Sequence, residues 1–427
     1  MIRNYWVQNF LSIRDKQELN FIAKGPQSEL VAEMENGEHI YKLGILFGPN
    51  ASGKSNMLWS IFSTFYLLVN PLSKEDEKIK CFFPFALTKE RPTQMSVSFY
   101  ANGIRYDYFI EYNKEAILKE ELLYYPNGSK ALFYEREFVS ENVQANIKFG
   151  STLGLKTKTK ENIKNNTLNN HSVLSVCQKN TFTKDIEPFT RLYKWVMAYY
   201  HNIDGDFSER GIVEILEEAY NNERKRKFFN QMLQKADLNI AGFHPIIKDR
   251  DVPKEIQEQI KKDNLCDKVK EELLSPTVKS FIFENHSDNG NFEIPLGWQS
   301  NGTVKYIRIL DILYNLTSGN HVYYLDELGE DLHYDLLIYY LNLFLFNSNQ
   351  SQLIITSQEI ALLLQDYINE NRGAIWFVDK NKKTASSEYS RGDSFGLHKN
   401  LSLYNSYSIG RLGAKPQLGS FFLDTEE

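Results

Sequence analysis

The feature that most constrains this chain is a loop with a glycine at each end, lying between an apolar run and a predicted helix. Residues 48–55 read GPNASGKS and match the pattern GxxxxGK[ST] at every fixed position. The apolar run KLGILF precedes the loop, and NMLWSIFSTFYLLV follows it with apolar residues at helical spacing. Strand, glycine loop and helix in this order are typical of a phosphate-binding loop (P-loop) in an α/β protein.

The residue types in this loop suit a nucleoside triphosphate. Glycines let the backbone turn so that successive N–H groups face phosphate oxygens, and the helix N-terminus adds its positive end. We expect Lys54 to reach the β- and γ-phosphates and Ser55 to ligate Mg²⁺. The predicted cofactors are therefore ATP and Mg²⁺. The predicted nucleotide-binding residues are Gly48, Pro49, Asn50, Ala51, Ser52, Gly53, Lys54, Ser55 and Asn56.

Two carboxylates end a second predicted strand far along the chain. His321 opens the run HVYYLDE, whose last two residues are Asp326 and Glu327. Open α/β sheets bind their ligands at the carboxyl ends of the strands. Behind a complete P-loop, we expect Asp326 to hold Mg²⁺ through water and Glu327 to polarise the water that attacks the γ-phosphate.

A third motif lies about 25 residues before the acidic strand. Ser300 and Gly302 form a Ser-x-Gly at the start of the predicted helix TVKYIRILDILYNL. Such a helix N-terminus can bind an anion, although the same pattern is also an ordinary helix cap.

The remaining sequence predicts three parts. Residues 1–150 hold the P-loop and an antiparallel sheet, because Asn102-Gly103 and Asn127-Gly128 each separate two β-rich runs. Residues 151–290 form a polar linker from about 150 to 180 and then a helical insertion over about 187–278. Residues 291–427 return to alternating strands and helices, including a helix over IALLLQDYINE, which implies a mostly parallel sheet.

Composition and charge exclude several classes of protein. The chain has 49 basic and 55 acidic residues, a net charge of −6, which argues against coating long nucleic acid by charge alone. Its three cysteines lie far apart without CxxC spacing, so neither a disulfide framework nor a zinc site is expected. No secretion signal or membrane span is predicted, and we expect a cytoplasmic protein without a membrane partner.

Together these motifs resemble the ATP-binding-cassette heads of SMC-like and RecF-like ATPases. They look closer still to the stand-alone AAA-family ATPases of bacterial abortive-infection and phage-defence systems, of the RloA, AbiLi and AriA kind. The local similarities are VQNFLS at 7–12, GPNASGKSN at 48–56, QKADLNI at 234–240 and GRLGAKP at 410–416. The resemblance implies a P-loop NTPase head of the ABC type, with an antiparallel β subdomain and a helical insertion between its P-loop and signature halves.

The resemblance also implies a mechanism. ATP bound at Lys54 of one subunit would be closed over by Ser300 and Gly302 of a second subunit, giving a homodimer or a higher homo-oligomer. The family carries a histidine γ-phosphate switch where this chain has Gln358, and an aspartate where it has Gly329. Glutamine can donate a hydrogen bond to phosphate but cannot carry a proton charge, so Gln358 is a catalytic candidate that implies slow or partner-stimulated turnover.

Three functions remain open at this point. The first is an ATP-hydrolysing switch that senses infection and controls a toxic effector. Only 69 residues follow Gln358 and they hold no nuclease motif, so the resemblance implies a separately encoded effector such as a Toprim-like or RloB-type nuclease. The second is a DNA-repair ATPase of the SMC/RecF kind, although the charge does not indicate DNA binding. The third is a nucleotide-gated scaffold with little hydrolysis.

Overall fold

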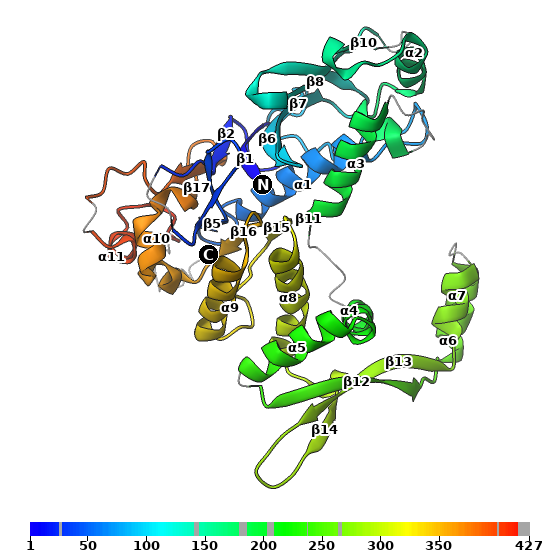
Figure 1. Ribbon diagram of the computed structural model, residues 1–427, viewed down its shortest axis with the longest axis vertical. Coiled ribbons are helices and arrows are strands. Elements are labelled where there is room, and N and C mark those ends of the chain that lie inside the picture. The colour runs from blue at the N-terminus through cyan, green and yellow to red at the C-terminus, as the bar shows by residue number, and fades with distance from the viewer. Residues whose placement is uncertain are drawn as a thin grey trace, which may run out of the picture. The chain divides into compact units, whose positions relative to one another are not determined.

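The computed structural model describes residues 1–24, 28–140, 145–178, 186–202, 209–236, 238–263, 267–398 and 401–416 (Figure 1). The chain forms two units. The first comprises Met1–Ile203, Leu316–Glu330 and Leu337–Glu427, and the second comprises Asp204–Asn315 and Asp331–Leu336. Among the described residues, no helix is both long and apolar enough to cross a bilayer.

A six-stranded sheet forms the centre of the first unit. Its order is β11-β15-β16-β5-β17-β18, and only the edge strand β18 runs antiparallel to its neighbour. Every residue of β5, β15 and β16 is buried, as expected for strands covered on both faces. The predicted, mostly parallel α/β sheet is confirmed. Its strands are β5 Leu43–Phe47, β11 Tyr200–Asn202, β15 Val322–Leu325, β16 Gln352–Ser357, β17 Ile375–Lys380 and β18 Ser387–Arg391.

The helices of this α/β part follow the predicted order, with one difference. The predicted helix over IALLLQDYINE is divided at Gln365, whose ψ of 130° is extended, into a 3₁₀ turn and a short α-helix. The elements are α1 Lys54–Val69, α3 Glu187–Tyr199, α9 Tyr334–Asn347, η6 Ile360–Leu364, α10 Asp366–Glu370, η7 Arg372–Ala374 and α11 Leu403–Ser408. A further helix, α8 Asn301–Ser318, belongs mainly to the second unit.

A seven-stranded antiparallel sheet, order β10-β9-β8-β7-β6-β1-β2, completes the first unit. Both predicted hairpins are confirmed. Asn102 and Gly103 have φ of 50° and 74° between β6 and β7, and Asn127 and Gly128 have φ of 55° and 79° between β8 and β9, conformations that suit Asn-Gly. The elements are β1 Ile2–Gln8, β2 Gln17–Asn20, β6 Thr93–Ala101, β7 Ile104–Tyr112, β8 Ile117–Tyr124, η1 Pro126–Gly128, β9 Ala131–Glu137 and β10 Asn146–Phe149.

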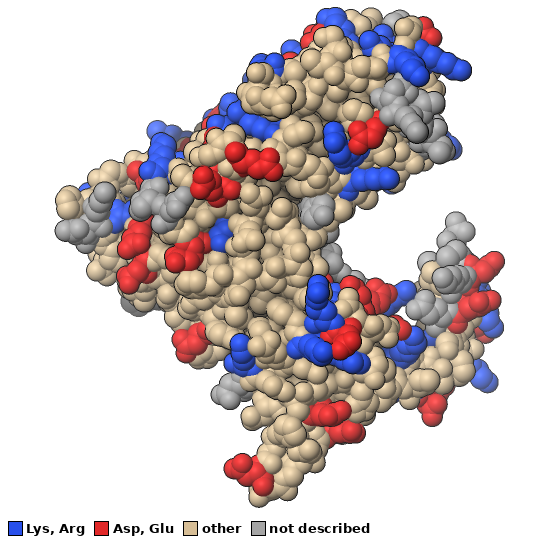
Figure 2. All heavy atoms as spheres, in the orientation of Figure 1, with Lys and Arg blue, Asp and Glu red and all other residues tan. Residues whose placement is uncertain are grey.

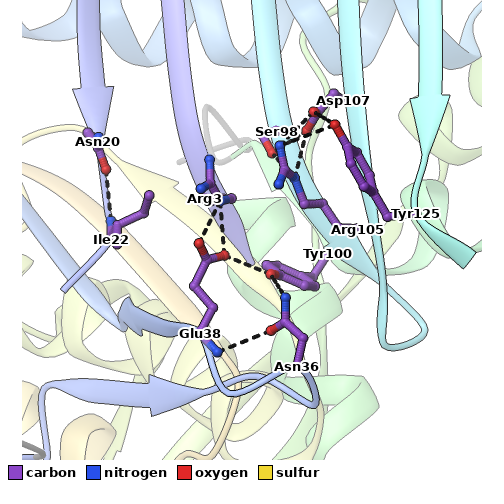
Figure 3. A network of polar contacts seen from close by, with 10 residues as sticks. All are labelled: Arg3, Asn20, Ile22, Asn36, Glu38, Ser98, Tyr100, Arg105, Asp107 and Tyr125. Atoms are coloured by element: carbon purple, nitrogen blue, oxygen red, sulfur yellow. Dashed lines mark hydrogen bonds and ion pairs between the residues drawn. The ribbon is translucent and has the colours of Figure 1, made fainter. Parts of the chain in front are cut away.

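A polar network fastens a small hairpin, β3 Val31–Glu33 and β4 His39–Tyr41, to this sheet (Figure 3). The Glu38 carboxylate accepts two hydrogen bonds of 2.9 Å from Arg3 Nε and one of 2.7 Å from the Tyr100 hydroxyl. Asn36 Nδ2 donates to the same hydroxyl at 2.9 Å. Burial raises the pKa of Tyr100 to about 12, so the hydroxyl stays a donor at neutral pH.

The predicted linker at 150–180 is wrong for its described residues, 150–178; residues 179–180 lie outside the described chain. This segment contains η2 Ser151–Leu153, α2 Thr157–Asn166 and η3 Leu174–Gln178. Its backbone is held against the sheet because the fully buried Arg136, 3.8 Å from the buried Glu120, donates to the backbone carbonyls of His171 at 2.6 Å and Asn169 at 3.0 Å. The segment therefore supplies acceptors for a buried guanidinium.

The predicted helical insertion at 187–278 is wrong in part, and its residues 203–208, 237 and 264–266 lie outside the description. The second unit has the helices α4 Glu209–Asn221, α5 Glu223–Lys235, α6 Lys254–Lys262 and α7 Asp267–Leu274. It also has an antiparallel sheet of β12 Ile240–Asp249, β13 Thr277–Asn285 and β14 Phe292–Pro295. The strands form because Phe243 and Phe283 are buried beside Phe229 of α5, with 6.2 Å between the Phe229 and Phe243 ring centroids.

Candidate nucleotide-binding site

The predicted P-loop joins β5 to α1 and is shaped by two glycines. Gly53, just before α1, has φ of 110°, and a side chain there would collide with the hydroxyls of Ser12 and Ser387. A side chain at Gly48 would collide with the Val378 carbonyl. Both positions therefore require glycine, for space at Gly48 and for space and backbone conformation at Gly53.

Hydroxyl groups from distant parts of the chain hold the second half of this loop. Ser387 of β18 donates to the Ser52 carbonyl at 2.5 Å, and its hydroxyl lies 2.7 Å from that of Ser12. Asn56 Nδ2 in turn donates to Ser12 Oγ at 2.6 Å. The loop is thus fixed by a chain of hydrogen bonds that reaches the first turn of α1.

A second brace comes from the same edge strand. The Tyr389 hydroxyl donates to the Gly53 carbonyl at 2.6 Å. Sequence reasoning missed Ser387 and Tyr389, because no local pattern marks residues that reach the loop from more than 330 positions away. Ser12 carried a weak signal, as it lies in the opening segment VQNFLS.

Lys54 lies at the start of α1 with its side chain folded over the loop. Its Nζ donates to the carbonyls of Gly48 at 2.9 Å and Pro49 at 3.1 Å. Burial lowers the pKa of this ammonium group, and the charges of Glu327 and Asp326 oppose that shift. The predicted phosphate-binding lysine therefore shares one electrostatic environment with the predicted acidic pair.

The acidic pair follows the carboxyl end of β15, where one threonine of β16 aligns both residues. Thr356 Oγ1 donates to Asp326 Oδ1 at 2.5 Å and accepts from the Glu327 backbone N–H at 2.8 Å. Glu327 has φ of 46°, a left-handed conformation uncommon for glutamate. Sequence reasoning did not assign a role to Thr356, which is fully buried.

Gln358 follows β16, the strand next to β15, and lies beside the Glu327 carboxylate. Its Nε2 donates to Glu327 Oε1 at 2.6 Å. Both side chains line a cavity of ≈ 290 Å³, to which Gly329, Glu330 and Glu359 also contribute, and we call it the carboxylate cavity. The three predicted catalytic residues, Lys54, Glu327 and Gln358, thus all belong to the first unit.

The Ser-x-Gly motif belongs to the second unit. Ser300 Oγ accepts from the Thr303 backbone N–H at 3.1 Å, which caps the first turn of α8. At Gly302, an added Cβ would lie 2.8 Å from the Asp331 carbonyl, so close approach of the backbone restricts this position to glycine.

The arrangement suits a triphosphate with a divalent cation. The Ser52 hydroxyl is buried without a hydrogen-bond partner among the described residues. Within the same part of the chain, no three histidine, cysteine or carboxylate side chains gather into a metal site. Mg²⁺ usually takes one or two protein ligands plus phosphates rather than a complete protein cage, which fits Ser55 and Asp326 beside a P-loop.

Residues 45–364 match the family described as "AAA domain, putative AbiEii toxin, Type IV TA system". Among solved structures, the SMC head domain from Thermotoga maritima is 14% identical, with 91% of this chain and 98% of that one covered and a TM-score of 0.37. A second, an SMC head bound to the C-terminal winged-helix domain of ScpA, is 12% identical, covers 95% and 99%, and has a TM-score of 0.43. No curated protein matches at a significant level.

Proposed function

The chain belongs to this AAA family of P-loop ATPases, and we propose that it binds and hydrolyses ATP at the site described above. The observation that carries the proposal is the grouping of Lys54, Asp326, Glu327 and Gln358 around one P-loop, with Thr356 aligning both carboxylates. A strand end that only terminated a sheet would not need this arrangement.

Each residue has a distinct task in the proposed reaction. The loop N–H groups and Lys54 bind the phosphates, and Ser55 and Asp326 would hold Mg²⁺, which supplies positive charge to the β- and γ-phosphates. Glu327 accepts a proton from the attacking water. Gln358 orients the Glu327 carboxylate through its amide, and this amide can also donate to a γ-phosphate oxygen.

We propose that a second copy of the chain completes the site. Ser300 and Gly302, at the N-terminus of α8, would cover the γ-phosphate bound by the partner. Two-fold symmetry then gives two nucleotides per dimer. Because ATP would bind the closed dimer better than the open form, the nucleotide acts as a switch.

The switch would control a toxic partner in bacterial phage defence. The family description names a toxin of a type IV toxin–antitoxin system, which supports a role in growth arrest or cell death. We propose a cytoplasmic protein whose effector is a separately encoded chain. The second unit, inserted between the P-loop and the acidic strand, is the proposed contact for that effector.

One observation favours a second candidate, a nucleotide-gated scaffold. The 2.6 Å hydrogen bond from Gln358 occupies an oxygen of Glu327 that a general base would offer to water. A chain that kept this bond with ATP bound would bind the nucleotide and hydrolyse it slowly.

Steady-state ATP turnover of the purified chain separates these functions. We expect the wild type to release phosphate, and both Lys54→Ala and Glu327→Gln to lose at least 90% of this rate. Glu330→Gln removes another carboxylate that lines the carboxylate cavity, and this variant should keep the wild-type rate of phosphate release. Binding of ATP with no more turnover than Glu327→Gln would refute the hydrolysing switch in favour of the scaffold. Stimulation of turnover by DNA, falling steeply with salt, would favour a DNA-repair ATPase.

A further inference from the structure

A second cavity adjoins the first residues of the P-loop. It measures ≈ 590 Å³ and is lined by Asn50, Gln358, Tyr407 and three lysines, Lys380, Lys382 and Lys415, and we call it the lysine pocket. It touches the first residues of the loop, Gly48–Asn50, but none of Gly53–Asn56, which begin the helix. The lysine pocket therefore shares Gly48–Asn50 with the predicted nucleotide-binding loop but does not reach the start of the helix.

The closing GRLGAKP segment forms one wall of this pocket, and its anchor is well defined. The Asp379 carboxylate at the end of β17 accepts from the Ala414 backbone N–H at 2.7 Å, and the Tyr407 hydroxyl donates to the Ala414 carbonyl at 2.7 Å. Gly413, with φ of 65°, lets this segment approach Asp379 closely. The segment thus holds Lys415 at the pocket and engages the one carboxylate that lines it.

The charge of the pocket is opposite to that of the chain. Three lysines and one aspartate line it, whereas the whole chain carries −6. On the face shown in Figure 2, acidic and basic side chains are interspersed. Within the described chain, none of these three lysines forms an ion pair, and Lys415 Nζ donates to the Ser408 carbonyl at 2.6 Å. Lysines gathered in a concave site without acidic partners attract phosphate oxygens.

We propose that the lysine pocket binds a small phosphate-bearing molecule of nucleotide size, in addition to the ATP held by the P-loop. The volume lies in the range of sites that take such ligands, and Tyr407, Phe47 and Ile360 give it an apolar wall. The binding itself does not depend on hydrolysis.

A consequence rests on the proposed ATPase function. Gln358 lines both the lysine pocket and the carboxylate cavity, where it donates to Glu327. A phosphate in the lysine pocket offers this amide another acceptor and so frees the Glu327 carboxylate. Occupancy of the pocket should therefore raise the rate of ATP hydrolysis.

Binding is tested in the full chain carrying Lys54→Ala, which disables the P-loop. Isothermal titration with inorganic pyrophosphate and with AMP should show one site. Adding Lys380→Gln and Lys382→Gln to this protein should weaken the affinity for both probes at least tenfold. Adding Lys383→Gln instead, which removes an exposed charge from the same turn but does not line the pocket, should leave affinity within twofold. No binding of either probe, or equal affinity in all three proteins, would overturn the proposal.

A 5′-phosphorylated single-stranded oligonucleotide distinguishes the source of the phosphate. Lysine-dependent binding of the oligonucleotide but of neither small probe would assign the pocket to nucleic acid and overturn the small-molecule ligand. The coupling is tested at saturating ATP with P-loop-intact proteins. AMP should raise turnover at least threefold in the wild type and in Lys383→Gln, and not in Lys380→Gln/Lys382→Gln. AMP binding without a rise in turnover would support the site and refute the coupling. If AMP binds but the wild type does not hydrolyse ATP at all, the result counts only against the proposed ATPase function.

Discussion

Thr356 aligns both carboxylates of the acidic pair with one hydroxyl group, and Thr356→Val tests this arrangement directly. Valine keeps the shape of the buried side chain and removes the donor to Asp326 and the acceptor for the Glu327 N–H. A hydrogen bond to a charged group contributes about 1.5–3 kcal/mol. Because the Asp326 side chain is exposed, water replaces part of that bond, and we take the lower end of the range.

If Thr356→Val removes about 1.5 kcal/mol of transition-state stabilisation, its kcat should be roughly tenfold lower than that of the wild type. The unpaired Glu327 N–H should also lower the free energy of unfolding by about 1 kcal/mol. The assay is steady-state phosphate release against ATP concentration, together with urea denaturation. Thr356→Ser is the matched control, because it keeps the hydroxyl group. Its kcat should stay within about threefold of the wild-type value. A valine variant with wild-type kcat, or a serine variant as impaired as the valine variant, would refute the role of the hydroxyl.

Two further predictions concern the switch position and the buried ion pair. Gln358→His should introduce a pH dependence of kcat near pH 6.5, the ordinary histidine pKa, which the wild type lacks; identical profiles for the two proteins would contradict the proposed contact with Glu327. Arg136→Met should lower the free energy of unfolding by about 3–5 kcal/mol, because it leaves the buried Glu120 without its cationic partner. Burial raises the pKa of Glu120 in the folded chain, so stability from this group falls as pH rises from the unfolded toward the folded pKa. The defect should therefore be smaller at pH 5 than at pH 8 in urea denaturation, and Glu120→Gln/Arg136→Met should lose that difference.

The parts of the fold with a local signature were predictable from sequence. The P-loop, the two Asn-Gly hairpins and the buried strands each depend on residues close together in the chain, and all are confirmed as structural elements. The ordered segment containing α2 was not predictable, because its backbone carbonyls are held by a buried arginine that lies more than 30 positions away in sequence. Strand β12 was missed because its flanks are helical and its partner β13 begins 28 positions after β12 ends.

The candidate site divides in the same way. Lys54, Asp326 and Glu327 were identified by motif, whereas the groups that hold them were not. Thr356 and Ser387 act through single hydroxyls whose partners lie 29 or more positions away, and serine or threonine at such positions has no distinctive pattern. Sequence therefore revealed the groups expected to contact the nucleotide, and the structure added those that orient them.

The position of β5 in the sheet has a consequence for biosynthesis. Its two neighbours are β16 and β17, so Leu43 pairs with Leu353 and Ile45 with both Ile355 and Ile375. A ribosome that has made the first 300 residues has therefore released a complete P-loop sequence without either strand that supports it. Contacts between such distant residues form slowly. A nascent or truncated chain that ends before β16 and β17 lacks both strands beside β5 and therefore cannot assemble the P-loop in its sheet.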